Sequence, residues 1–97
     1  MAQLEIVTKS VGGAANPLVA VDGVPVSLNG EGKGQTTVTG TCGDGSGHML
    51  VISFLGPVGA AMGVTVTCGG AAVCEIKEIK VTPLREPYGA SHRSFKL

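Results

Sequence analysis

The dipeptide Asp22-Gly23 is the feature that most narrows the folds open to this chain. It stands at the middle of residues 18–28, LVAVDGVPVSL, where apolar side chains alternate on either side of it. An Asp-Gly pair in this setting forms a two-residue turn with positive φ and joins two antiparallel strands. Pairing about the turn predicts two opposed pairs on one buried face, Val21 with Val24 and Val19 with Val26.

Other segments with period-two alternation follow at regular spacing. They predict strands at residues 3–8, 36–42, 48–55 and 63–68. Residues 48–55 are apolar on both faces, which is typical of a central or interface strand. Pro25 cannot donate to a ladder, so its strand is expected at a sheet edge or beside a bulge.

Residues 71–82 are ambiguous between two structures. Val73, Ile76 and Ile79 recur at every third position, a spacing that suits a short helix nearly as well as a strand. The β-branched content and the Val81-Thr82-Pro83 sequence that follows favour a strand with a bulge.

The strand spacing predicts an all-β fold, a small antiparallel β-sandwich of about six to seven strands with Greek-key connections. Its strand number and alternation resemble an immunoglobulin-like sandwich at the level of architecture only. The core Trp and the tyrosine corner of true immunoglobulin domains are missing. The interval from Cys42 to Cys68 is also too short for the inter-sheet disulfide of that family, so no family is assigned.

Residues 1–82 are expected to form the sandwich and residues 83–97 an extended C-terminal arm. Pro83, Pro87 and Gly89 discourage regular structure in the arm, which also holds two of the three aromatic side chains. An ordered arm of this kind can lie on a neighbouring subunit, with aromatic anchors and arginines as contacts.

Charge and hydropathy narrow the range of partners. Seven basic and seven acidic residues cancel, which disfavours a nucleic-acid binder because no counterion release is available. Residues 45–74 lack charged side chains, but glycines and Pro57 interrupt the run, so two buried strands are expected there in place of a membrane span. The N-terminal sequence lacks the features of a secretory signal, so we expect cytoplasmic synthesis, compatible with incorporation into a virion.

The cysteines admit three interpretations. Cys42 and His48 have the same spacing as Cys68 and Cys74, and each pair brackets a glycine-rich turn, so the four could bind zinc. Zinc knuckles usually space their ligands more closely, which weakens that hypothesis. Cys68 and Cys74 could instead form a hairpin disulfide that leaves Cys42 unpaired. The favoured interpretation is buried thiols.

Two segments predict contacts with other molecules. Residues 56–63 form a connector without a polar side chain, which folds over its own sandwich or docks on another subunit. Together with the arm they give the expected interface residues: Pro57, Val58, Met62, Arg85, Tyr88, Arg93 and Phe95.

Catalytic patterns are missing from the sequence. No serine lies in a nucleophile elbow and no two carboxylates are placed for acid and base roles. Residues 43–47, GDGSG, hold one carboxylate, too few for a calcium cage, and are expected to be a turn.

The sequence therefore predicts a non-enzymatic structural or assembly protein without a cofactor. It would bind copies of itself or decorate a larger particle such as a phage or virus capsid or tail. The alternatives are a metal- or ligand-binding module and a secreted adhesion-type sandwich.

Overall fold

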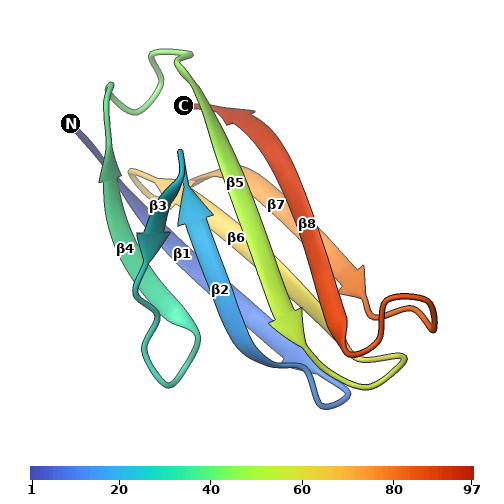
Figure 1. Ribbon diagram of the computed structural model, residues 1–97. Coiled ribbons are helices and arrows are strands. Elements are labelled where there is room, and N and C mark those ends of the chain that lie inside the picture. The colour runs from blue at the N-terminus through green and yellow to red at the C-terminus, as the bar shows by residue number, and fades with distance from the viewer.

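The computed structural model describes every residue from Met1 to Leu97 and is built of strands and their connections (Figure 1). Its strands are β1 Ala2–Val11, β2 Ala15–Val21, β3 Val24–Val26, β4 Lys33–Val38, β5 Gly47–Leu55, β6 Ala61–Cys68, β7 Ala71–Lys80 and β8 Tyr88–Lys96. The all-β prediction is confirmed. The strand number is eight, because the C-terminal segment forms a strand that the sequence analysis did not expect.

The strands form two antiparallel sheets of four, with the orders β4-β1-β6-β7 and β3-β2-β5-β8. The sheets lie face to face as two layers, and both termini lie at the same end (Figure 1). The chain passes between the sheets repeatedly, and β4 returns to pair with β1 after the β2–β3 hairpin in the other sheet. The architecture is a β-sandwich.

The Asp22-Gly23 hairpin has the predicted turn and register. Asp22 has φ of 52° and Gly23 of 79°, as the two-residue turn requires. Val19 lies opposite Val26, and Val21 lies opposite Val24. Val24 is exposed at the end of the hairpin, so three of the four valines are buried rather than all of them. β3 is an edge strand, as the presence of Pro25 predicted.

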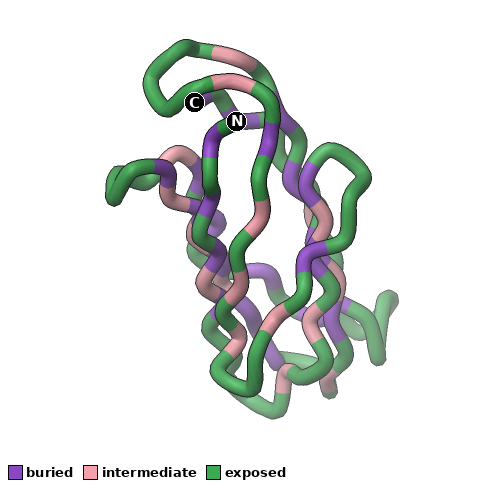
Figure 2. The backbone as a smooth tube through the Cα atoms, turned by 90° about the vertical axis from the view of Figure 1, so that its left-hand side faces the viewer, coloured by how far each residue is buried: buried purple, intermediate pink, exposed green.

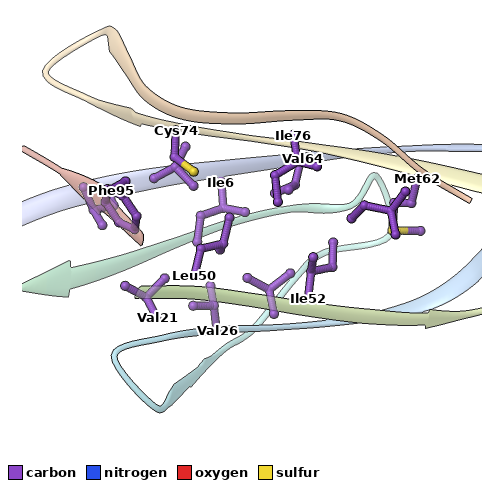
Figure 3. Packing of buried hydrophobic residues seen from close by; sticks show 14 of the residues in the cluster. Ile6, Val21, Val26, Leu50, Ile52, Met62, Val64, Cys74, Ile76 and Phe95 are labelled. Carbon is purple, nitrogen blue, oxygen red and sulfur yellow. The ribbon is translucent and has the colours of Figure 1, made fainter. Parts of the chain in front are cut away.

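The core between the sheets is mainly aliphatic, with two phenylalanines and the sulfur-containing side chains of Met62, Cys68 and Cys74. It contains 21 buried residues drawn from both inner faces. Figure 3 shows side chains such as Val64 and Ile76 from one sheet meeting Leu50 and Ile52 from the other. Buried and exposed residues alternate along most strands (Figure 2), which is the pattern that a sheet with one covered face imposes.

The structure decides two assignments that the sequence left open or placed differently, the strand after Cys68 and the end of β4. In the segment 71–82, residues 71–80 form a strand, β7, and its pairing with β6 shifts register twice, so the predicted strand with a bulge is confirmed. The strand predicted at 36–42 ends earlier, at Val38. Gly40 has φ of 111°, a conformation that breaks a strand, and Cys42 consequently lies in a loop.

The segment predicted as an extended C-terminal arm, residues 83–97, belongs to the sandwich over most of its length. Residues 88–96 form β8, which pairs with β5 from Leu55–Tyr88 to Gly47–Lys96 without a register shift. Phe95 and Leu97 enter the core. Local sequence could not reveal this strand because its glycine, alanine and serine residues have little strand propensity, and pairing with β5 decides its conformation.

Residues 45–74, the long uncharged run, form β5, β6 and the beginning of β7. The prediction of two strands in this run is confirmed. No helix in the structure could cross a membrane.

Gly89 offers a test of how tightly β8 packs against β5, because Gly89 and Phe54 are cross-strand partners in one sheet. A Cβ placed there would overlap the ring of Phe54, which is fully buried and cannot move aside. We expect Gly89→Ala to lower the free energy of unfolding by about 1–3 kcal/mol. Gly47→Ala is the matched control, because nothing lies near its Cβ position. Chemical denaturation measures both, and equal stabilities would contradict the packing described.

Candidate functional site

The predicted zinc ligands are not gathered in one place. Cys42 and Cys68 are joined by a disulfide, so neither supplies a thiolate. Cys74 is a buried free cysteine on β7, and no group of three histidine, cysteine or carboxylate side chains is placed to bind a metal ion. The alternative of a Cys68–Cys74 disulfide is also wrong, and the favoured prediction of buried thiols holds for Cys74 alone.

The disulfide links a loop to a strand end. Cys42 lies between β4 and β5, while Cys68 is the last residue of β6. The β4 prediction had placed Cys42 inside a strand, and the break at Gly40 frees it to reach Cys68. A cross-link across 26 positions restricts the unfolded chain and stabilises the fold by about 3 kcal/mol.

His48 is the centre of a second link at the same end of the sandwich. Its Nδ1 donates to the Asp22 carboxylate at 2.6 Å, and its Nε2 lies 3.1 Å from the Ser46 hydroxyl. Only 3% of the His48 side chain is exposed, against 40% for Asp22. The ring also packs beside Phe95, with the two centroids 5.7 Å apart. Both polar atoms of this buried imidazole are therefore satisfied.

Asp22 has a double role in the hairpin. It occupies the turn, and its other carboxylate oxygen accepts a hydrogen bond from the backbone N–H of Met49 at 2.9 Å. The hydrogen bond from His48, supported by the one from Met49, holds the pKa of Asp22 below its usual value despite some desolvation. This carboxylate fastens the β2–β3 hairpin to β5.

Asp44 organises the adjacent loop, residues 39–46. Its carboxylate accepts from the backbone N–H of Thr41 at 2.7 Å and from that of Ser46 at 2.8 Å. A hydrogen bond from the Ser46 side chain, followed by the two backbone bonds, lowers the pKa of Asp44 to about 2. Residues 43–46 of the predicted turn at 43–47 lie in this loop, while Gly47 already begins β5.

The order Asp22, His48, Ser46 has the connectivity of a nucleophilic triad. Its surroundings argue against that chemistry. The Ser46 hydroxyl has one proton, and Asp44 competes with His48 for it. The Asp44 carboxylate would also repel the oxyanion that acyl transfer requires nearby. We interpret the cluster as a structural brace that joins the hairpin, the loop and β5.

The interface residues predicted from the sequence divide into two groups. Met62 and Phe95 are buried in the core, so their assignment to an interface is wrong. Met62 already belongs to β6, and the connector proper is residues 56–60, which is held by Gly59 N–H donating to the Val81 carbonyl and folds over its own sandwich. The other five are exposed: Pro57, Val58, Arg85, Tyr88 and Arg93.

An exposed apolar surface covers the outer face of sheet β3-β2-β5-β8, and we call it the apolar face. Cross-strand partners such as Ala20–Val51 and Leu55–Tyr88 lie on it. Its members are Leu18, Ala20, Pro25, Met49, Val51, Ser53, Leu55, Tyr88, Ala90, His92, Ser94 and Lys96. Lys96 is its one Asp, Glu, Lys or Arg, and it lies at the end of β8.

The outer face of the other sheet has the opposite character. It carries the residues Gln3, Glu5, Val7, Lys9, Lys33, Gln35, Thr37, Thr65, Thr67, Glu75 and Lys77. Polar side chains bond across its strands, as Gln3 Nε2 does in donating to Gln35 Oε1 at 2.9 Å. This outer face, which we call the charged face, carries the polar and charged side chains that a sheet surface in contact with water requires. The contrast marks the apolar face as the candidate functional site.

The sequence predicted part of the apolar face. The apolar character of residues 48–55 on both faces indicated an interface strand, and Tyr88 was predicted as a contact. The roles of Ser46, Asp44 and the Asp22 carboxylate were missed. The Asp-Gly turn was by itself a sufficient reason for an aspartate at position 22. Nothing in the sequence shows that the Asp22 carboxylate also contacts a histidine 26 residues later.

Comparisons with protein families, with curated proteins and with solved structures found no match to this chain.

The cysteine pairing can be tested by counting thiols. Denatured protein that has not been reduced should show one reactive thiol, Cys74, and folded protein almost none, because burial raises the pKa of this thiol and shields it. A double Cys42→Ser, Cys68→Ser variant should lose about 3 kcal/mol of stability. Three thiols in the denatured, unreduced protein would show that the disulfide is not formed.

The lowered pKa values of Asp22 and Asp44 predict that the protein loses stability in acid. Because the folded-state pKa of each is lowered, their contribution is present above the unfolded value near 4 and is lost as pH falls toward about 2 for Asp44. We expect the stability of Asp44→Asn to vary less with pH over that interval than that of the parent. Glu31→Gln is the control, since Glu31 lies in an exposed turn. Urea denaturation at pH 7, 4 and 2.5 makes the comparison.

Proposed function

We propose that this chain is a non-enzymatic structural protein that assembles with copies of itself through the apolar face. The observation that carries the proposal is the difference between the two outer sheet faces, one charged and the other almost free of charge. Leu18 and Tyr88 are 71% and 61% exposed on the apolar face, and contiguous apolar surface of this kind marks interaction sites.

The size of the apolar face is sufficient for a specific contact. Four strands spaced about 4.8 Å apart give a width of about 19 Å, and a strand of the length of β5 is about 30 Å long. The face therefore covers about 500 Å² per copy and about 1,000 Å² for a pair. This area is at the lower limit of specific interfaces, so the association is expected to be reversible and to depend on concentration.

A second copy is the occupant that best fits the chemistry. An interface between identical faces is two-fold symmetric, so each face must tolerate its own image. A face with Lys96 as its one charge, and that charge at a strand end, meets its image without burying unpaired charges. The charged faces of both copies then stay in water.

Two finer features belong to the same proposal. The return of β4 beside β1 supports a Greek-key, immunoglobulin-like path.

Attachment to a larger particle, such as a capsid or tail, stays a prediction, since an apolar face able to bind its own image can bind a similar surface on another protein.

The proposal predicts the effect of a charge placed on either face. Val51→Lys puts an ammonium at the centre of the apolar face, and self-association should weaken at least tenfold because two like charges would be buried. Thr65→Lys places the same group on the charged face and should leave association unchanged. Sedimentation velocity over a range of concentrations measures both. Identical mass distributions for Val51→Lys and the parent would refute the role of the apolar face.

A further inference from the structure

The sandwich has four edge strands, and three of them carry devices that block pairing with another chain. β3 has three residues, one of them Pro25. β4 begins at Lys33 and is bridged by Leu28 at Gly34. β7 pairs with β6 through two register shifts and bears Glu75, Lys77, Glu78 and Lys80. Short length, proline, bulges and charges are the means by which sheets protect their edges.

β8 lacks the short length, the proline and the register shifts, and its two charged residues, Arg93 and Lys96, lie toward its C-terminal end. It is nine residues long, contains no proline and pairs with β5 in an uninterrupted register. Its central residues Ala90, His92 and Ser94 face solvent. The guanidinium of Arg93, which could have guarded the edge, instead donates to the Glu75 carbonyl on β7. β8 is therefore the one long, regular and unprotected edge.

The backbone groups on the free side of β8 can be identified. On either side of the strand, Pro87 accepts from Gly56 N–H and Leu97 N–H donates to Ser46, so odd-numbered residues face β5. Hydrogen-bonded and outward-facing residues alternate along an antiparallel strand. The N–H and C=O groups of Ala90, His92 and Ser94 consequently point away from the sheet and have no strand partner.

We propose that β8 pairs with β8 of a second copy, antiparallel about a two-fold axis at His92. This register overlaps the whole strand, because His92 is at the middle of Tyr88–Lys96. It opposes His92 to its own copy and Ala90 to Ser94, and it forms about six backbone hydrogen bonds. The result is one continuous sheet of eight strands from two copies, with the two apolar faces side by side.

A second copy fits this edge better than an unrelated peptide. Pairing of identical edges closes on itself, so one contact satisfies the free edges of both partners. At the two ends Tyr88 of one copy meets Lys96 of the other, an aromatic ring beside an ammonium. The proposal rests on the proposed function only in that both contacts join copies of this chain. It uses the backbone edge of β8, whereas the proposed function uses the outward side chains of the whole sheet, those of β8 included.

A cross-linking experiment tests the register. His92→Cys would place two thiols about 5.5 Å apart at the level of the Cα atoms across the axis. In Ala90→Cys the corresponding distance is about 14 Å, because the two residues are four positions apart along the strands. With a short bis-maleimide that cannot span 14 Å, we expect covalent dimers from His92→Cys and few from Ala90→Cys. Cys74 is buried in both variants.

A proline substitution on β8 shows whether the contact between copies depends on backbone hydrogen bonds or on side chains. In the His92→Cys background, Ser94→Pro removes an outward N–H without removing a bond to β5, and the yield of covalent dimer should fall at least fivefold. Ser94→Ala keeps that N–H and should keep the yield, and circular dichroism confirms that both variants are folded. Equal yields for His92→Cys and Ala90→Cys, or a yield that folded Ser94→Pro leaves intact, would overturn the edge contact.

The experiment also separates this contact from the apolar face. Leu18→Lys places a charge on the β2 part of the apolar face, whereas Val51 is the cross-strand partner of His92 and a lysine there would lie beside the new thiol. Adding Leu18→Lys to His92→Cys should lower the association measured by sedimentation but leave the cross-linked yield within twofold, because β8 keeps its edge. A Leu18→Lys chain with unchanged mass distribution counts against the proposed function and leaves the edge result standing. Loss of the His92→Cys product in the Leu18→Lys background overturns an independent edge contact.

Discussion

The attachment of loop 39–46 to both sheets is the constraint on which the rest of the structure depends. The Cys42–Cys68 disulfide joins the loop to the β4-β1-β6-β7 sheet. The contact of Ser46 with His48 joins it to the opposite sheet. A core with Phe54 and Phe95 as its aromatic side chains has limited area to hold two sheets together, so covalent and polar ties at its end contribute a substantial share of the stability.

β5 connects the interior of the molecule to its surface. One side of the strand supplies Leu50, Ile52 and Phe54 to the core, while the other supplies Met49 and Val51 to the apolar face. Because β2 and β8 flank it, β5 is held by hydrogen bonds on both edges. The apolar face is therefore rigid before any partner arrives, and a rigid surface loses little entropy when it binds.

The sequence predicted those elements whose local and long-range requirements agree. The Asp22-Gly23 turn and the valines beside it specify the same register, so turn, pairing and most of the burial were correct. β8 was missed because its conformation depends on pairing with β5 rather than on its own residues. The disulfide was missed because its formation depends on a backbone break at Gly40 that allows Cys42 to leave the sheet. The brace was missed because Asp22 and His48 become neighbours only when β2 pairs with β5.

The unequal chemistry of the two outer faces makes the folded chain an amphiphile. Its charged face is readily hydrated and its apolar face is not, so one sheet has the role that the acyl chain has in a surfactant. A monolayer of such particles on an apolar surface would turn the same way up. The carboxylates and ammonium groups of Glu5, Lys9 and Lys77 would then form its outer boundary. A coat one sandwich thick would thus convert an apolar surface into a hydrated one that carries charges of both signs.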